Sequence, residues 1–250
     1  MYATLDPRKI IDTLDTLERR IGERFPGAGL TRVCSELKRF AAENSARVKR
    51  ISSPNLGLRA FILAIVVASI VLLAYLGSVI EFKRDADNLY GVMQGIDAFI
   101  NVLIVGGAAL IFLLTLEERL RRRRALADLH GLRSIIHVID MHQLTKDPSH
   151  GARVGSATPS SPDRTMTAYE LSRYLDYCSE MLSLAAKAAA LYAQAIPDPV
   201  IIEAVADIER LTAGLSAKIW QKIMIIEQSR LATSKAQPET PAVAAETAAD

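Results

Sequence analysis

Residues 60–80 read AFILAIVVASIVLLAYLGSVI, a run of 21 residues without a charged side chain. A second uncharged run, AFINVLIVGGAALIFLLTL, covers the 19 residues 98–116. A helix rises about 1.5 Å per residue and the apolar core of a bilayer is about 30 Å thick, so roughly 20 apolar residues cross it. The sequence therefore predicts two membrane-spanning helices, at about 59–80 and 97–116, with a short external loop at 81–96. The alternative is a pair of buried core helices in a soluble protein.

The same two runs account for an unusual composition. Half of the 250 residues are hydrophobic and the mean hydropathy is +0.18, although 23% of the residues are charged. Every Asp, Glu, Lys and Arg lies outside the two runs. The apolar fraction excludes disorder throughout the chain, and two cysteines are too few for a disulfide scaffold. A net charge of +2 argues against a strongly basic nucleic-acid binder, so no nucleic-acid partner is expected.

Positive charge next to the two runs predicts their orientation, because cytoplasmic flanks carry an excess of Lys and Arg. The segment 81–97 between the runs holds two basic residues against four acidic ones. The outer flanks are more basic, and both chain termini are therefore expected in the cytoplasm. The basic residues on these flanks are Arg47, Lys49, Arg50, Arg59, Arg119, Arg121, Arg122, Arg123, Arg124 and Arg133.

Outside the two runs, apolar residues recur at steps of three and four, which is typical of amphipathic helices and coiled-coil packing. The sequence thus predicts an all-α integral membrane protein, a two-span transmembrane helical hairpin with a cytoplasmic helical bundle. The expected divisions are an N-terminal cytoplasmic helical hairpin at 1–55, the transmembrane hairpin at 56–117, a cytoplasmic helical extension at 118–146, a flexible linker at 147–166, an antiparallel helical hairpin at 167–233 and a disordered tail at 234–250.

Local signals mark where several helices begin. Asp6 followed by Pro7 is typical of an N-cap and a first helical residue. Thr167 and Glu170 have the spacing of a capping box, in which two backbone amides are satisfied reciprocally. A helix that continues past the second run is expected to reach Leu144, because residues 117–144 contain no proline.

All four histidines lie within 21 residues, around the string HVIDMHQLTKDP at 137–148. His137 and Asp140 are one helical turn apart and can share a metal ion or a hydrogen bond. His142 points about 140° away from His137 on a helix, so a three-ligand site would need help from another helix or another subunit. We consider His137, Asp140 and His142 candidate metal ligands. The alternatives are a polar cluster that fixes helix packing and a surface that binds a protein or a lipid headgroup.

The basic run Arg121, Arg122, Arg123 and Arg124 directly follows the second predicted span. Four consecutive residues face all sides of a helix and cannot line one groove. We expect them to lie at the membrane surface, to anchor the topology and to attract anionic lipid by about 1 kcal/mol for each basic residue. Specific recognition of a lipid or of a nucleic acid is the alternative, although no aromatic residues interleave the run to support nucleic-acid binding.

No nucleotide-binding or hydrolase motif is present: GxxxxGK[ST], GxGxxG after a strand and GxSxG are all missing. We therefore expect no cofactor and assign no catalytic residue. The sequence favours a non-enzymatic, membrane-tethered interaction module, a scaffold, sensor or effector that acts at the cytoplasmic face of the lipid bilayer. We expect it to form a homo-oligomer and to bind a cytoplasmic protein partner. The alternatives are a membrane enzyme that uses residues 137–142 and a small oligomeric channel.

The amino-acid composition gives an indication of the cellular compartment. Arg outnumbers Lys by 21 to 9 and alanine is abundant, which is typical of GC-rich bacterial genomes. This association favours a bacterial inner membrane. Cys34 and Cys178 fall among apolar helix positions and are expected to be buried, reduced thiols.

The predicted topology can be tested by cysteine labelling in sealed cells. A membrane-impermeant maleimide added outside should label a cysteine at Asn88 and miss one at Ser160, because only the short loop is expected outside. The chain without either added cysteine is the control for background labelling of Cys34 and Cys178. The reverse pattern would contradict the orientation.

Overall fold

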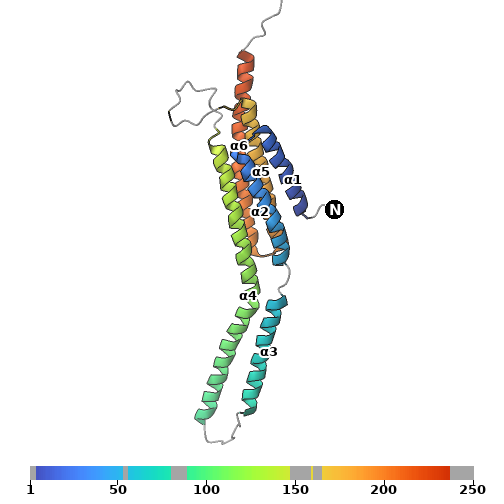
Figure 1. Ribbon diagram of the computed structural model, residues 1–250. Coiled ribbons are helices and arrows are strands. Elements are labelled where there is room, and N and C mark those ends of the chain that lie inside the picture. Colours follow the sequence, from blue (N-terminus) through green and yellow to red (C-terminus); the bar gives the residue numbers. More distant parts are fainter. Residues whose placement is uncertain (1–3, 53–55, 80–88, 147–158, 160–164, 237–250) are drawn as a thin grey trace, which may run out of the picture. The chain divides into compact units, whose positions relative to one another are not determined.

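The computed structural model describes residues 4–52, 56–79, 89–146, 159 and 165–236, and every regular element in this part is an α-helix (Figure 1). The all-α prediction is therefore confirmed for the described residues. The helices are α1 (Pro7–Arg24), α2 (Gly29–Ser52), α3 (Leu56–Val79), α4 (Leu89–Leu144), α5 (Ala168–Ala195) and α6 (Pro199–Ala236).

The chain divides into two compact units. We call Met1–Arg47 together with Asp128–Asp250 the bundle, and Val48–Ala127 the apolar unit. The bundle contains α1, α5 and α6, whereas α3 lies in the apolar unit. Helices α2 and α4 contribute residues to both units.

Helix α1 begins as its sequence predicts. The side chain of Asp6 accepts a hydrogen bond from the backbone N–H of Arg8 at 2.9 Å, and Pro7 takes the first helical position. Its buried residues follow at steps of four and three, so one face packs inward. The chain then reverses through a turn in which Gly27 has a φ of 76°, a conformation that favours glycine. The buried residues of α1 are Ile10, Leu14, Leu17 and Ile21.

Polar and aromatic contacts join α1 to its neighbours in the bundle. Lys38 of α2 pairs with Asp15 of α1 at 3.0 Å. Arg20 of α1 donates two hydrogen bonds to the carboxylate of Glu180 on α5, at 3.0 and 3.3 Å. Phe25, directly after α1, packs edge-on against the ring of Tyr174, with ring centroids 5.4 Å apart. These contacts fix α1 against both α2 and α5.

Helices α5 and α6 lie side by side and are joined by the three residues 196–198 (Figure 1). The capping box predicted at the start of α5 is confirmed, since Thr167 and Glu170 each accept from the other's backbone amide. Asp198 caps α6 by accepting from the backbone N–H of Val200 at 2.9 Å. Small buried residues allow close approach of the two helices. Those of α5 are Ala185, Ala188 and Ala189.

The apolar unit contains both uncharged runs of the sequence. By length and composition, one described stretch, Gly95–Leu144 within α4, could cross a membrane, and a shorter apolar stretch, Arg59–Leu72, lies in α3. None of the most apolar window in α4 is buried. The first predicted span, 59–80, ends outside the described residues, so the two-span arrangement stays a prediction.

Two predicted boundaries differ from the observed helices. Helix α4 begins at Leu89, within the predicted loop 81–96, because residues 89–97 contain no proline to stop it. Helix α6 continues to Ala236, past the predicted start of the tail at 234, and Pro238 follows shortly after. The expected linker 147–166 and the rest of the loop and tail lie almost entirely outside the described residues. The predicted continuation of the helix to Leu144 is confirmed.

The capping box gives a stability prediction. Replacing Thr167 with Ala should lower the free energy of unfolding by about 1 kcal/mol, because the backbone N–H of Glu170 loses its partner. Thr165→Ala is the matched control, since this exposed threonine precedes the cap. Chemical denaturation of the full chain in detergent micelles measures both, and equal losses would contradict the assigned role of Thr167.

Candidate functional site

The three candidate metal ligands of α4 do not converge. His137 is exposed, and Asp140 accepts a hydrogen bond from Nε2 of Gln143 at 2.6 Å rather than one from His137. His142 lies half-buried on another face, with Nδ1 3.2 Å from the hydroxyl of Tyr174. Among the described residues, no three His, Cys, Asp or Glu side chains lie close enough together to hold a metal ion. The metal site stays a prediction that this arrangement does not support.

His142 instead packs at a close approach of two helices. A Cβ atom added at Gly29, the first residue of α2, would lie 2.8 Å from Cε1 of the His142 ring. Glycine is therefore the residue that allows α2 to begin next to this ring. Burial lowers the pKa of His142, and the positive charges of Lys146 and Arg32 lower it further. The neutral imidazole is thus the form that fits the folded bundle.

Asp140 belongs to a second polar group that links α4 to α6. Nζ of Lys222 on α6 donates to the backbone carbonyl of Gln143 at 2.8 Å and to its Oε1 at 2.7 Å. Gln143 in turn donates to Asp140. The amide of Gln143, which is buried, is therefore satisfied from both sides.

A third polar group, which we call the Asp128 clamp, links α4 to α2 and α5. Nη1 of Arg47 donates to Oδ1 of Asp128 at 2.9 Å, and the hydroxyl of Tyr192 donates to Oδ2 at 3.1 Å. The Asp128 side chain is only 10% exposed. Burial and the adjacent carboxylate both raise the pKa of Tyr192, so its hydroxyl remains a donor. Arg47 and Asp128 are also the residues at which the chain leaves and re-enters the bundle.

Sequence reasoning missed the Asp128 clamp, although α4 carries a signal for it. Asp128 follows Ala125 by three residues and precedes Leu132 by four, so an acid occupies a position on the buried apolar face. A carboxylate on such a face needs a partner when the helix packs. Its partners come from α2 and α5, and the sequence contains no spacing that identifies them.

The basic run after the second predicted span lies in the apolar unit. Arg121 pairs with Glu117 one turn earlier on α4. Arg123 and Arg124 are exposed, and Arg122 is half-buried. The four side chains therefore have different surroundings, as expected for consecutive residues on one helix.

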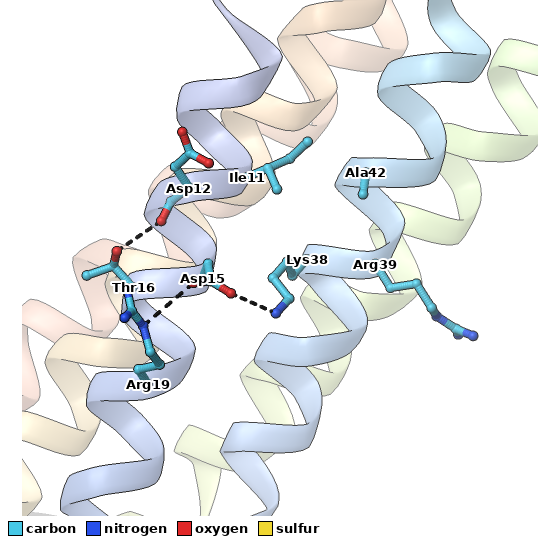
Figure 2. Close-up of a pocket in the computed structure, with 8 residues that line it drawn as sticks. All are labelled: Ile11, Asp12, Asp15, Thr16, Arg19, Lys38, Arg39 and Ala42. Atoms are coloured by element: carbon cyan, nitrogen blue, oxygen red, sulfur yellow. Dashed lines mark hydrogen bonds and ion pairs between the residues drawn. The ribbon is translucent and has the colours of Figure 1, made fainter.

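A cleft with a largely charged lining lies between α1 and α2. It has a volume of about 530 Å³ and is shown in Figure 2. Lys38 reaches across it from α2 to Asp15, and Arg19 approaches the same carboxylate at 3.6 Å. The hydrogen bond from Lys38 lowers the pKa of Asp15. This pairing keeps Asp15 ionised, as one member of an ion-pair group with Lys38 and Arg19.

Both cysteines are buried free thiols, as predicted. Burial raises the pKa of Cys34 and of Cys178 to about 12. The thiolate is the reactive form of cysteine, so neither residue is suited to nucleophilic or redox chemistry near neutral pH.

The chain matches none of the family models, curated proteins or solved structures with which it was compared. The polar groups described above connect helices of the bundle.

The position of His142 predicts a pH dependence. Its pKa in the folded chain lies below the ordinary value of 6.5, so the unfolded chain takes up a proton first as the pH falls. The free energy of unfolding should therefore be unaffected by the titration of His142 above about pH 6.5. It should decrease as the pH falls below this value, because protonation of His142 then favours the unfolded chain. Thermal unfolding of the full chain at a series of pH values measures this, and His142→Gln should reduce the dependence.

His137→Gln is the matched control, because His137 is an exposed histidine on the same helix. If both variants keep the pH dependence of the original chain, another group causes it and the assignment to His142 is wrong.

Proposed function

We propose that this protein is a membrane-tethered helical interaction module. In this proposal α3 and α4 span the bilayer, both termini lie in the cytoplasm of a bacterial cell, and the bundle self-associates through α6. The observation that carries the proposal is the large exposed apolar surface on helices of both units, because isolated soluble proteins rarely expose such surfaces.

The apolar unit supports the membrane part of the proposal. A core helix of a soluble protein is mostly buried, whereas the apolar window of α4 is 0% buried. The exposed side chains of α3 and α4 are large and aliphatic or aromatic, which suits contact with lipid. Among them are Phe61, Leu63, Val67, Ile70, Val71, Leu103, Ile104, Val105 and Ile111.

The bundle supports the interaction part. Five apolar residues that are exposed follow one another along α6 at steps of four, three, four and seven. At about 100° per residue they fall within a sector of about 60°, apart from the face that packs on α5. We call them the α6 stripe; they are Ala213, Ala217, Trp220, Met224 and Leu231.

A second copy of this chain is the partner we propose for the α6 stripe. Steps of four and three are the spacing by which two helices pack in a coiled coil. Two copies anchored in one membrane share the same orientation, so a parallel pairing brings each stripe residue next to its counterpart. Small residues at Ala213 and Ala217 leave room for Trp220 and Met224 to pack nearby. No observation on the described residues favours the enzyme or the channel.

Disulfide trapping in membranes tests self-association. A cysteine at Ala217 should form a covalent dimer on mild oxidation, because symmetric pairing brings the two Cβ atoms to within a few ångströms. Lys218→Cys is the matched control, since it is exposed on the next residue but lies outside the stripe. Cys34 and Cys178 are buried and should give little background.

Dimers from the cysteine at Ala217 but not from the one at Lys218 would support the proposed pairing. Equal trapping at both positions would indicate random collision. Absence of trapping at Ala217 would contradict self-association through α6.

A further inference from the structure

The apolar unit contains a cleft of about 580 Å³ between α3 and α4, within the range of sites that hold small molecules. Both helices contribute to it, and all of its lining residues belong to this one unit. One end of the cleft is apolar and the other is charged. The apolar lining consists of Ile62, Leu63, Val66, Leu110 and Leu114.

The charged end is organised around a buried carboxylate. The Glu117 side chain is 12% exposed and accepts a hydrogen bond from Nε of Arg59 at 2.9 Å. Arg121 bonds to the other carboxylate oxygen. The bond from Arg59 uses Nε, so the terminal amino groups of its half-exposed guanidinium remain as further donors.

A second carboxylate lies at the same end. Glu118 lines the cleft and is exposed, and among the described residues it forms no ion pair. The charged end thus offers donors on Arg59 and an acceptor on Glu118, with two basic and two acidic side chains in balance. A neutral balance of this kind does not select for an anionic molecule.

We propose that this cleft binds a phospholipid whose headgroup carries both a phosphate and a primary ammonium, that is, phosphatidylethanolamine. The acyl chain lies against the apolar lining, Arg59 binds the phosphate, and Glu118 accepts hydrogen bonds from the ammonium group. The inference rests on the proposed membrane insertion, in which this charged end lies at the inner membrane surface. The exposed Arg123 and Arg124 are outside the lining and attract anionic lipid separately.

Headgroup chemistry gives the proposal its specificity. The ammonium of phosphatidylethanolamine has N–H donors, whereas the trimethylammonium of phosphatidylcholine has none and is bulkier. Phosphatidylglycerol has a phosphate but no cationic group for Glu118. A hydrogen bond between charged groups corresponds to a preference of about tenfold over either of these lipids.

Native mass spectrometry of the full chain, released from detergent micelles, tests this preference. The three lipids are titrated with identical acyl chains, and the original chain should bind one phosphatidylethanolamine about tenfold more tightly. Glu118→Gln should bring phosphatidylethanolamine to the level of phosphatidylcholine. Arg59→Lys keeps the charge next to Glu117 but loses the forked donors, and it should weaken all three lipids.

Glu203→Gln, an exposed carboxylate on α6, is the matched control and should leave the preference unchanged. Equal binding of the three lipids, or a preference that survives Glu118→Gln, would overturn the lipid site.

Membrane insertion is measured separately, by alkaline extraction of vesicles that contain the full chain. If the chain stays in the vesicles and shows no headgroup preference, only the lipid site is wrong. If alkali releases the chain, the proposed membrane insertion is wrong and the lipid site falls with it.

Discussion

A buried carboxylate must be paired, and in the bundle this requirement falls on Asp128. Its two oxygens bond to Arg47 of α2 and Tyr192 of α5, so three helices must keep one register for both bonds to form. Apolar contacts tolerate small shifts along a helix, whereas hydrogen bonds weaken steeply when their angle is poor. Arg47 is half exposed and partly screened by water, so each bond contributes on the order of 1 kcal/mol. The Asp128 clamp therefore contributes little to the free energy of unfolding, and its main effect is to fix the register of the three helices.

The features that could be predicted from the sequence are those set by neighbouring residues. The caps at Asp6 and Thr167 depend on side chains within three positions, and the continuation of α4 depends on the absence of proline. The Asp128 clamp could not be found in this way, because Arg47 and Asp128 are 81 positions apart. The histidines show that closeness in sequence can also mislead. Their closeness in sequence suggested a shared site, but helical periodicity places His137 and His142 on different faces.

The exposed apolar residues of the two units differ in a way that bears on their partners. In α3 and α4 they surround the helix, with few charges between them, which suits an environment that is apolar on all sides. In α6 the five residues of the α6 stripe share one face, whereas the exposed Val200 and Ile225 and the charged Lys218 lie outside it. A one-sided stripe suits another helix. The same physical property, exposed apolar area, thus supports lipid as the partner of one unit and protein as the partner of the other.

The position of Trp220 has an optical consequence. It is the chain's single tryptophan, and it is 62% exposed in the middle of the α6 stripe. The tryptophan emission of the whole protein therefore originates from one point on one surface of the bundle. Covering that point removes water from the indole and shifts the emission to shorter wavelength. The protein thus carries an intrinsic, label-free reporter at the surface through which its copies are proposed to meet.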